Sequence, residues 1–227
     1  MKQQDYSLWL ANGTVLLVAN DLPTEQRQAA LDTLIYAQLL ANKKQGPRLT
    51  HFPKWHEAYV QAISMTGWII TQRSNEHATG KNDAPLSLTQ PLQEWLHGRN
   101  PAAVPALNYA LATIAHGSAE CLRSLTHQTH AHGSCALLEV GVVQTGPVID
   151  LCCVFVDCSV PLEQVGLGCM MAGDTLREYW MKGFCATLDP ASFEKHQARL
   201  HETIAEKQAE FRYLVPLDEL NTGGGRE

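Results

Sequence analysis

The order of the predicted elements indicates an α+β fold. An Asn-Gly turn between two apolar runs opens the chain, helical segments follow, and four strand segments precede a last helix. Strands in one run and helices in another are typical of α+β proteins rather than of a parallel α/β sheet. Because consecutive strands usually lie side by side, we expect a four-stranded antiparallel meander. Several α-helices pack on it, including long helices before and after the sheet.

The first element is an N-terminal hairpin. Asn12-Gly13 separates the apolar runs 6–11 and 14–19. Both central residues of the tight turn that joins hairpin strands need a positive φ, and Asn-Gly is the strongest short-range signal for such a turn. The pattern therefore predicts two strands paired across Asn12-Gly13.

Helices are predicted where a proline or a capping residue precedes apolar residues at helical spacing. The expected helices begin at Asp21-Leu22-Pro23 and end at Gly46-Pro47, begin at Pro53, run from Pro91 to Leu96, run from Leu107 to Leu125, and run from Asp189-Pro190 to Leu214. Residues 73–83 contain Ala78 as their single apolar side chain, so we expect an exposed loop there.

The most informative segment is a second hairpin that is apolar on nearly all of both faces. Its arms are residues 135–143 and 148–158, joined by residues 144–147. A soluble antiparallel sheet usually buries one face and exposes the other. This hairpin instead needs cover on both sides, from helices, a partner chain or a lipid. Strands over residues 165–172 and 177–187 complete the predicted meander.

Composition narrows the class of protein. The 227 residues are 45% hydrophobic and 18% charged, which is below the roughly 25% charged residues of soluble domains. The formal net charge is -6 and the isoelectric point is about 5.9. Nucleic-acid binding is not expected, because no basic stripe is present. We expect one α+β domain over residues 1–217 and a flexible tail over residues 218–227.

Cysteine usage and the N-terminus indicate a cytoplasmic site of synthesis. The seven cysteines are odd in number, lie mostly among apolar residues and form no CxxC pair, as expected of reduced thiols. The first residues do not form a signal peptide, because Lys2 is the one early basic residue and Asn12-Gly13 interrupts the apolar run. Leaderless export remains open. The sequence has no stretch of 18 apolar residues for a transmembrane helix.

Two acidic residues of the second hairpin are candidate catalytic groups. If Val143 pairs with Val148, then Glu139 and Asp150 lie diagonally on one face, with Cα atoms roughly 7–8 Å apart. Two carboxylates on an apolar face repel each other, which raises one pKa and separates an acid from a base. In the alternative interpretation, both carboxylates face water or pair with basic side chains.

A histidine-rich connection is a candidate metal site. His127, His130, His132 and Cys135 offer imidazole and thiolate ligands of the kind that zinc or copper prefers. No second Cys or His pair completes a structural zinc site, so a solvated histidine-rich turn is the alternative. We expect no cofactor.

These features favour a non-enzymatic interaction protein. Its apolar hairpin and helices would mediate self-assembly, binding of a protein partner, or association with a lipid surface. The layout is similar, by analogy, to soluble pore-forming toxins, which cover such a hairpin with helices until they meet lipid; a role in virulence would follow from that analogy. One alternative is a small hydrolase that uses Glu139 and Asp150 or the histidine cluster. Another is a carrier with an apolar cavity between the sheet and the long helices.

Overall fold

The computed structural model describes residues 5–80, 86–116, 134–159, 170–171 and 175–215. The strands are β1 (Tyr6–Ala11), β2 (Thr14–Ala19), β3 (Trp68–Thr79), β4 (Leu86–Ser87), β5 (Cys135–Gln144), β6 (Val148–Cys158), β7 (Met170–Met171), β8 (Leu176–Leu188) and β9 (Arg212–Val215). The helices are α1 (Thr24–Gln45), α2 (Phe52–Ser64), α3 (Thr89–Arg99), α4 (Val104–His116), α6 (Pro190–Ile204) and α7 (Gln208–Phe211), with a 3-10 turn at Pro101–Ala103.

The α+β class is confirmed, but the four-stranded meander is wrong. The described residues form a seven-stranded sheet in the order β3-β8-β6-β5-β2-β1-β9. Its neighbouring strands are antiparallel except for β2 and β5, which are parallel. The N-terminal hairpin therefore belongs to the same sheet as the second hairpin.

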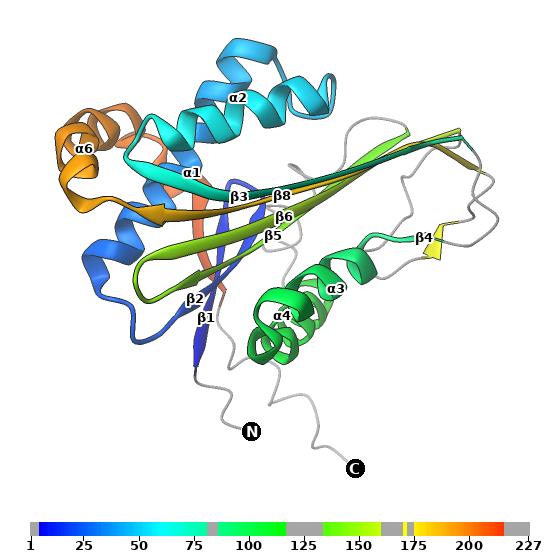
Figure 1. Cartoon of the computed structure of the whole chain (residues 1–227), viewed down its shortest axis with the longest axis horizontal. Coiled ribbons are helices and arrows are strands. Elements are labelled where there is room, and N and C mark those ends of the chain that lie inside the picture. The colour runs from blue at the N-terminus through cyan, green and yellow to red at the C-terminus, as the bar shows by residue number, and fades with distance from the viewer. Residues whose placement is uncertain (1–4, 81–85, 117–133, 160–169, 172–174, 216–227) are drawn as a thin grey trace.

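Helices cover both faces of this sheet. Figure 1 shows α1, α2 and α6 on one side of the strands and α3 with α4 on the other. Each helix layer encloses its own hydrophobic core against the sheet. Of the helices over the described residues, none is both long and apolar enough to cross a membrane.

The predicted second hairpin is confirmed, and it is buried on both faces. In β5 and β6 every residue is buried apart from the first and last of β5, the first of β6 and Asp157. Antiparallel sheets often leave one face in water, so the double cover is a specific property of this fold. Strands at the centre of a sheet between two helix layers have no face left for polar side chains, which explains the apolar sequence.

The first hairpin is also confirmed. Asn12 has a φ of 49° and Gly13 a φ of 86°, as the two-residue turn requires. The register pairs Ala11 with Thr14 directly across this turn.

The third strand of the predicted meander does not enter the main sheet. Met170–Met171 pairs with β4 in a separate two-stranded sheet, and β8 pairs directly with β6. The backbone N–H of Ser159 donates to the carbonyl of Thr175 at 2.7 Å, which brings β8 back beside β6. Residues 165–169 lie outside the described residues, as does the predicted turn at Gly173-Asp174.

Neither edge strand was predicted over its full length. The expected loop over residues 73–83 is strand β3 as far as Thr79, and its side chains are mostly exposed because β3 forms one edge of the sheet. The expected last helix is divided into α6, which ends at Ile204, and α7, which ends at Phe211, and Arg212–Val215 forms β9 along β1 at the other edge. The helix predicted to reach Leu125 is observed as α4 to His116, and residues 117–125 lie outside the described part of the chain, as does the predicted tail over 218–227.

Candidate functional site

Ionisable side chains lie buried between the sheet and the layer formed by α1, α2 and α6. Glu139 of β5 is 1% exposed, Asp32 of α1 is 0% exposed and His56 of α2 is 6% exposed. A buried ionisable group costs free energy unless it is paired or neutral. We therefore treat these three groups and their partners as the candidate functional site.

Glu139 lies in a hydrogen-bonded cluster at the centre of this layer. The hydroxyl of Thr14 donates to Glu139 Oε1 at 2.6 Å, and the hydroxyl of Tyr59 donates to the same atom at 3.1 Å. Thr14 is placed there by the parallel register of β2 and β5, which pairs it with Glu139. Burial raises the pKa of the Glu139 carboxyl, and the nearby Arg48 guanidinium and the two hydrogen bonds oppose the rise.

The cluster extends to α1 and to the residues that follow it. Gln38 Nε2 donates to Thr14 Oγ1 at 2.7 Å, which joins α1 to the sheet. Arg48 Nη2 donates to the carbonyl of Asn12 at 3.1 Å. Burial, followed by the charge of Glu139, raises the pKa of Tyr59, so its hydroxyl keeps the proton that it donates. The whole cluster is thus enclosed by protein.

His56 is enclosed by aromatic rings. Its ring centroid lies 5.8 Å from that of Phe52, 6.2 Å from that of Tyr59 and 6.5 Å from that of Phe184. Burial, and then the charges of Lys182 and Arg73, lower the pKa of His56 from 6.5 to about 3. The imidazole is therefore neutral at neutral pH, and no described residue hydrogen-bonds its Nε2.

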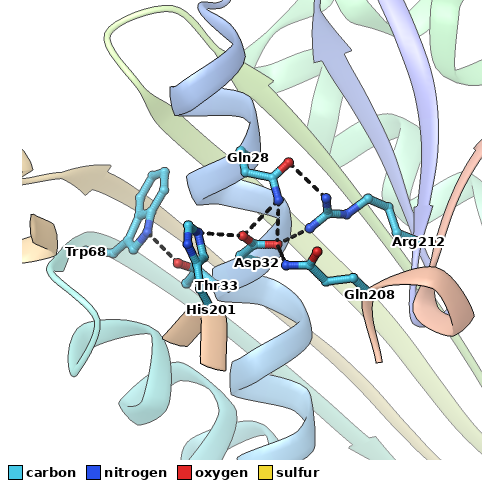
Figure 2. A network of polar contacts seen from close by, with 7 residues as sticks. All are labelled: Gln28, Asp32, Thr33, Trp68, His201, Gln208 and Arg212. Atoms are coloured by element: carbon cyan, nitrogen blue, oxygen red, sulfur yellow. Dashed lines mark hydrogen bonds and ion pairs between the residues drawn. The ribbon is translucent and has the colours of Figure 1, made fainter. Parts of the chain in front are cut away.

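Asp32 joins α1 to the C-terminal segment α6–β9 (Figure 2). Gln28 Nε2 donates to both carboxylate oxygens of Asp32, at 3.1 and 2.9 Å, and Arg212 of β9 forms an ion pair with Oδ1. Gln208 of α7 donates to Oδ1 at 3.4 Å, and His201 Nε2 of α6 lies 3.1 Å from Oδ2. Burial raises the pKa of Asp32, and Arg212, Gln28 and His201 oppose that effect.

Figure 2 also shows a hydrogen bond between α1 and β3. Trp68 Nε1 donates to Thr33 Oγ1 at 3.0 Å. Trp68 opens β3, so this bond fixes α1 to the end of the edge strand that follows α2.

The predicted pairing of Glu139 with Asp150 on one face is wrong. The observed register pairs Val143 with Ile149 and Glu139 with Cys153, one residue away from the expected register. A shift of one residue moves a side chain to the opposite face of a strand. Glu139 therefore faces α2, whereas Asp150 faces α3, where Arg99 Nη1 lies 3.5 Å from Asp150 Oδ1. The two carboxylates do not form an acid and base pair.

The predicted metal site falls largely outside the described residues. His127, His130 and His132 lie within 117–133, which the structure does not describe. Cys135 begins β5 as a half-buried free thiol, and burial followed by Asp157 raises its pKa. In the part of the chain that is described, no three His, Cys, Asp or Glu residues gather as a metal site would require. The metal ligands therefore stay a prediction.

Two groups of the candidate site are out of reach of a substrate in bulk solvent. Glu139 and His56 are closed off from solvent, and general acid–base catalysis needs a group within hydrogen-bond reach of its substrate. A cavity of about 410 Å³ lies elsewhere, beside Asp5, Tyr6, Asp21 and Thr145. This hollow is lined mostly by polar residues and is not the apolar space between sheet and helices that a carrier needs.

Sequence reasoning found Glu139 but not its partners. Asp32 and Gln38 interrupt the apolar face of the first helix, and His56 stands between Trp55 and Tyr59 on the apolar face of the second. A polar side chain on a helix face that is otherwise apolar is the signal that identifies such groups, because a buried polar group needs a partner.

Glu139→Gln is expected to change how the free energy of unfolding depends on pH. With a raised pKa, folded Glu139 holds a proton that the unfolded chain has released, so stability falls as the pH rises above 4.5. Glutamine keeps an oxygen for Thr14 and Tyr59 and does not titrate. Urea unfolding at several pH values should show the variant gaining stability relative to wild type as pH rises. Glu57→Gln, at an exposed glutamate of α2, is the matched control. If the difference in free energy of unfolding between wild type and Glu139→Gln does not change with pH, the raised pKa of Glu139 is contradicted.

Comparisons with known proteins give limited guidance. No protein-family model matches the chain, and no curated protein matches it. The chain is similar to a solved delta-endotoxin at 15% identity over 79% of this chain and 82% of that chain, with a TM-score of 0.44. It is also similar to the Evf virulence factor at 13% identity over 92% of this chain and 85% of that chain, with a TM-score of 0.32. Both TM-scores are too low to establish a shared fold, so neither similarity indicates a function for this chain.

Proposed function

We propose that the chain is a non-enzymatic interaction protein that transfers its central hairpin from the helix layers to a lipid bilayer. The observation that carries this proposal is the burial of both faces of β5 and β6. The helices that provide this cover on each face contribute separate hydrophobic cores. A bilayer would keep the apolar side chains of one face of such strands out of water, and pairing between hairpins of several copies of the chain would satisfy the backbone groups at the strand edges.

The two faces of the hairpin differ in a way that suits a bilayer. The face toward α3 and α4 carries an unbroken apolar set over most of its length: Ala136, Leu138, Val140, Val142, Cys152, Val154, Val156 and Cys158. The opposite face carries Glu139 at its middle. Membrane strands alternate between lipid-facing apolar residues and residues that face a polar interior. The face toward α3 and α4 is therefore the one that would meet lipid.

Strand length supports the same proposal. β5 has 10 residues and β6 has 11, and a tilted strand of about 9–11 residues crosses the apolar layer of a membrane. Asp150 faces the apolar side near the turn of the hairpin, two residues after β6 begins. At that position its charge would meet the interface rather than the bilayer centre, where charge is most costly.

Dye release from phosphatidylcholine vesicles that contain a minority of phosphatidylglycerol tests the proposal. Wild type should float with the vesicles and release the dye. Thr145 is exposed at the tip of the hairpin, and Thr145→Lys should slow release because the tip must cross the bilayer, where a lysine at the midplane costs about 2–4 kcal/mol. Thr50→Lys, at another exposed threonine, should behave as wild type. Absence of both flotation and release at every pH would overturn the proposal, and association of the chain with itself without lipid would favour self-assembly instead.

A further inference from the structure

Helix α2 is the most amphipathic, aromatic-rich cover of the sheet. Its buried face includes Phe52, Trp55, His56, Tyr59 and Ile63. The polar side chains of Lys54, Glu57, Gln61 and Ser64 are exposed on the other face. Helices that lie in a membrane interface likewise carry Trp and Phe on the apolar face, and the polar face of α2 adds one basic and one acidic residue, Lys54 and Glu57.

Glycines flank α2 at both ends. Gly46 has a φ of 77°, and a side chain added there would meet nothing within 4 Å, whereas Gly67 has a φ of 92° and an added Cβ would lie 2.5 Å from the backbone nitrogen of Phe193 in α6. Residues with positive φ of this kind favour glycine because it has no Cβ. The chain before α2 therefore has room to turn at Gly46, as a helix that moves as a unit requires, whereas at Gly67 the end of α2 is held against α6.

His56 is the buried basic side chain of α2. It packs against Phe184 of β8 and Phe52 and Tyr59 of its own helix. The charged groups that face it are Lys182 of β8 and Arg73 of β3. Both are cations, so a third positive charge, on His56, would be repelled as well as desolvated.

The remaining charged groups near α2 are already engaged. Arg48, which follows α1, lies 6.0 Å from the Trp55 ring, and Glu139 of β5 accepts from Tyr59 and Thr14. From α1, the neutral Asn42 accepts a hydrogen bond from Trp55 Nε1 at 2.7 Å. None of these contacts offers His56 a counter-ion.

We propose that α2 leaves the sheet when His56 is protonated and then lies with its aromatic face on a lipid surface. This inference rests on the proposed function, because it names the condition that starts the transfer and the element that first meets lipid. The pKa of His56 is about 3 when it is covered and 6.5 in water. Acid below 6.5 therefore favours the uncovered state. Glu139 acts in the opposite sense, because its pKa is raised when it is covered, so variants at His56 are needed to isolate the effect.

The test measures flotation with vesicles of phosphatidylcholine and a minority of phosphatidylglycerol across acidic pH. Wild-type binding should rise as the pH falls below 6.5, the value for exposed histidine. His56→Phe keeps an aromatic ring without a titrating group, so its binding midpoint should move down by at least about one pH unit. His97→Gln removes an exposed imidazole from α3 and should bind as wild type. Circular dichroism checks folding, and His56→Leu replaces His56→Phe if the larger ring does not fit.

Hydrogen exchange of the α2 amides, compared between variants at one acidic pH, shows whether α2 is the element that moves. These amides should lose protection in wild type and in His97→Gln, but not in His56→Phe. Two results would overturn this inference and leave the proposed function standing. In the first, His56→Phe binds vesicles with the same pH midpoint as wild type. In the second, wild type binds vesicles while its α2 amides stay protected. Absence of wild-type binding at every pH overturns the proposed function, whatever α2 does.

Discussion

Wild type is expected to lose stability as the pH falls below 6.5, and His56→Phe is expected to lose much less. Folded His56 has a pKa of about 3, and the unfolded value is 6.5. A group whose pKa is lowered by folding contributes stability that is fully present above the unfolded pKa and is lost as the pH falls toward the folded one. One pKa unit corresponds to 1.36 kcal/mol, so wild type should lose about 2 kcal/mol by about pH 5 and about 4 kcal/mol near the folded pKa.

Urea unfolding from neutral to acidic pH measures this loss directly. The relevant quantity is the difference in free energy of unfolding between wild type and His56→Phe at each pH, because the other groups titrate equally in both proteins. His97→Gln, which removes an exposed histidine, should follow the wild-type curve. A difference between wild type and His56→Phe that stays constant with pH would show that His56 is not held neutral by the fold.

Arg212→Ala is expected to lower the free energy of unfolding by about 3–5 kcal/mol, because it leaves a buried carboxylate without its main counter-ion. Asp32 is 0% exposed, and the Arg212 side chain is 14% exposed. The same substitution also frees β9 from α1, because Arg212 Nη1 donates to Gln28 Oε1 at 2.9 Å. The free energy of unfolding, measured in urea at neutral pH, gives the effect.

Two comparisons separate this effect from simple loss of a side chain. Lys207→Ala breaks an exposed pair with Glu210 and should cost less than about 1 kcal/mol. Asp32→Asn added to Arg212→Ala should recover part of the loss, since it removes the orphaned charge. If Arg212→Ala costs no more than Lys207→Ala, Asp32 does not fasten the C-terminal segment.

The central strands and their double cover were predictable from the sequence, because burial on both faces leaves a run of apolar residues that no other arrangement explains. The register between these two strands was not predictable from the sequence. Residues 144–147 fit more than one loop length, and the observed loop has three residues between Gln144 and Val148. One residue of difference placed Glu139 and Asp150 on opposite faces.

The edge strands escaped prediction for a physical reason. β3 takes its hydrogen bonds from β8 on one side and exposes most of its side chains, so its sequence has the polar character of a loop. β9 spans Arg212–Val215 and continues directly from α7, so its apolar residues extend the helical pattern. In both places, pairing with a distant strand decides the structure, and local sequence carries little sign of it.

The candidate site was predictable only in part. Glu139 is conspicuous in an apolar strand, but Thr14, Tyr59 and Arg48 are 80 or more residues away in the chain and meet it through the fold. Asp32 likewise gains its ion pair from Arg212, which is 180 residues distant. Contacts over such separations depend on sheet order, which the sequence alone did not establish.

Cys152 and Cys153 offer the most direct measurement of the central claim that the hairpin moves into a bilayer with the Glu139 face toward water. Both thiols are fully buried, and they point to opposite faces, Cys152 toward α3 and α4 and Cys153 toward α2. Two variants are made, one that retains only Cys152 and one that retains only Cys153, with every other cysteine replaced by serine. Each variant is then treated with a charged thiol reagent that does not cross membranes. Without vesicles neither should react; with vesicles Cys153 should become reactive while Cys152, against lipid, should not. Equal reactivity of the two thiols with vesicles, or none in either, would contradict the account.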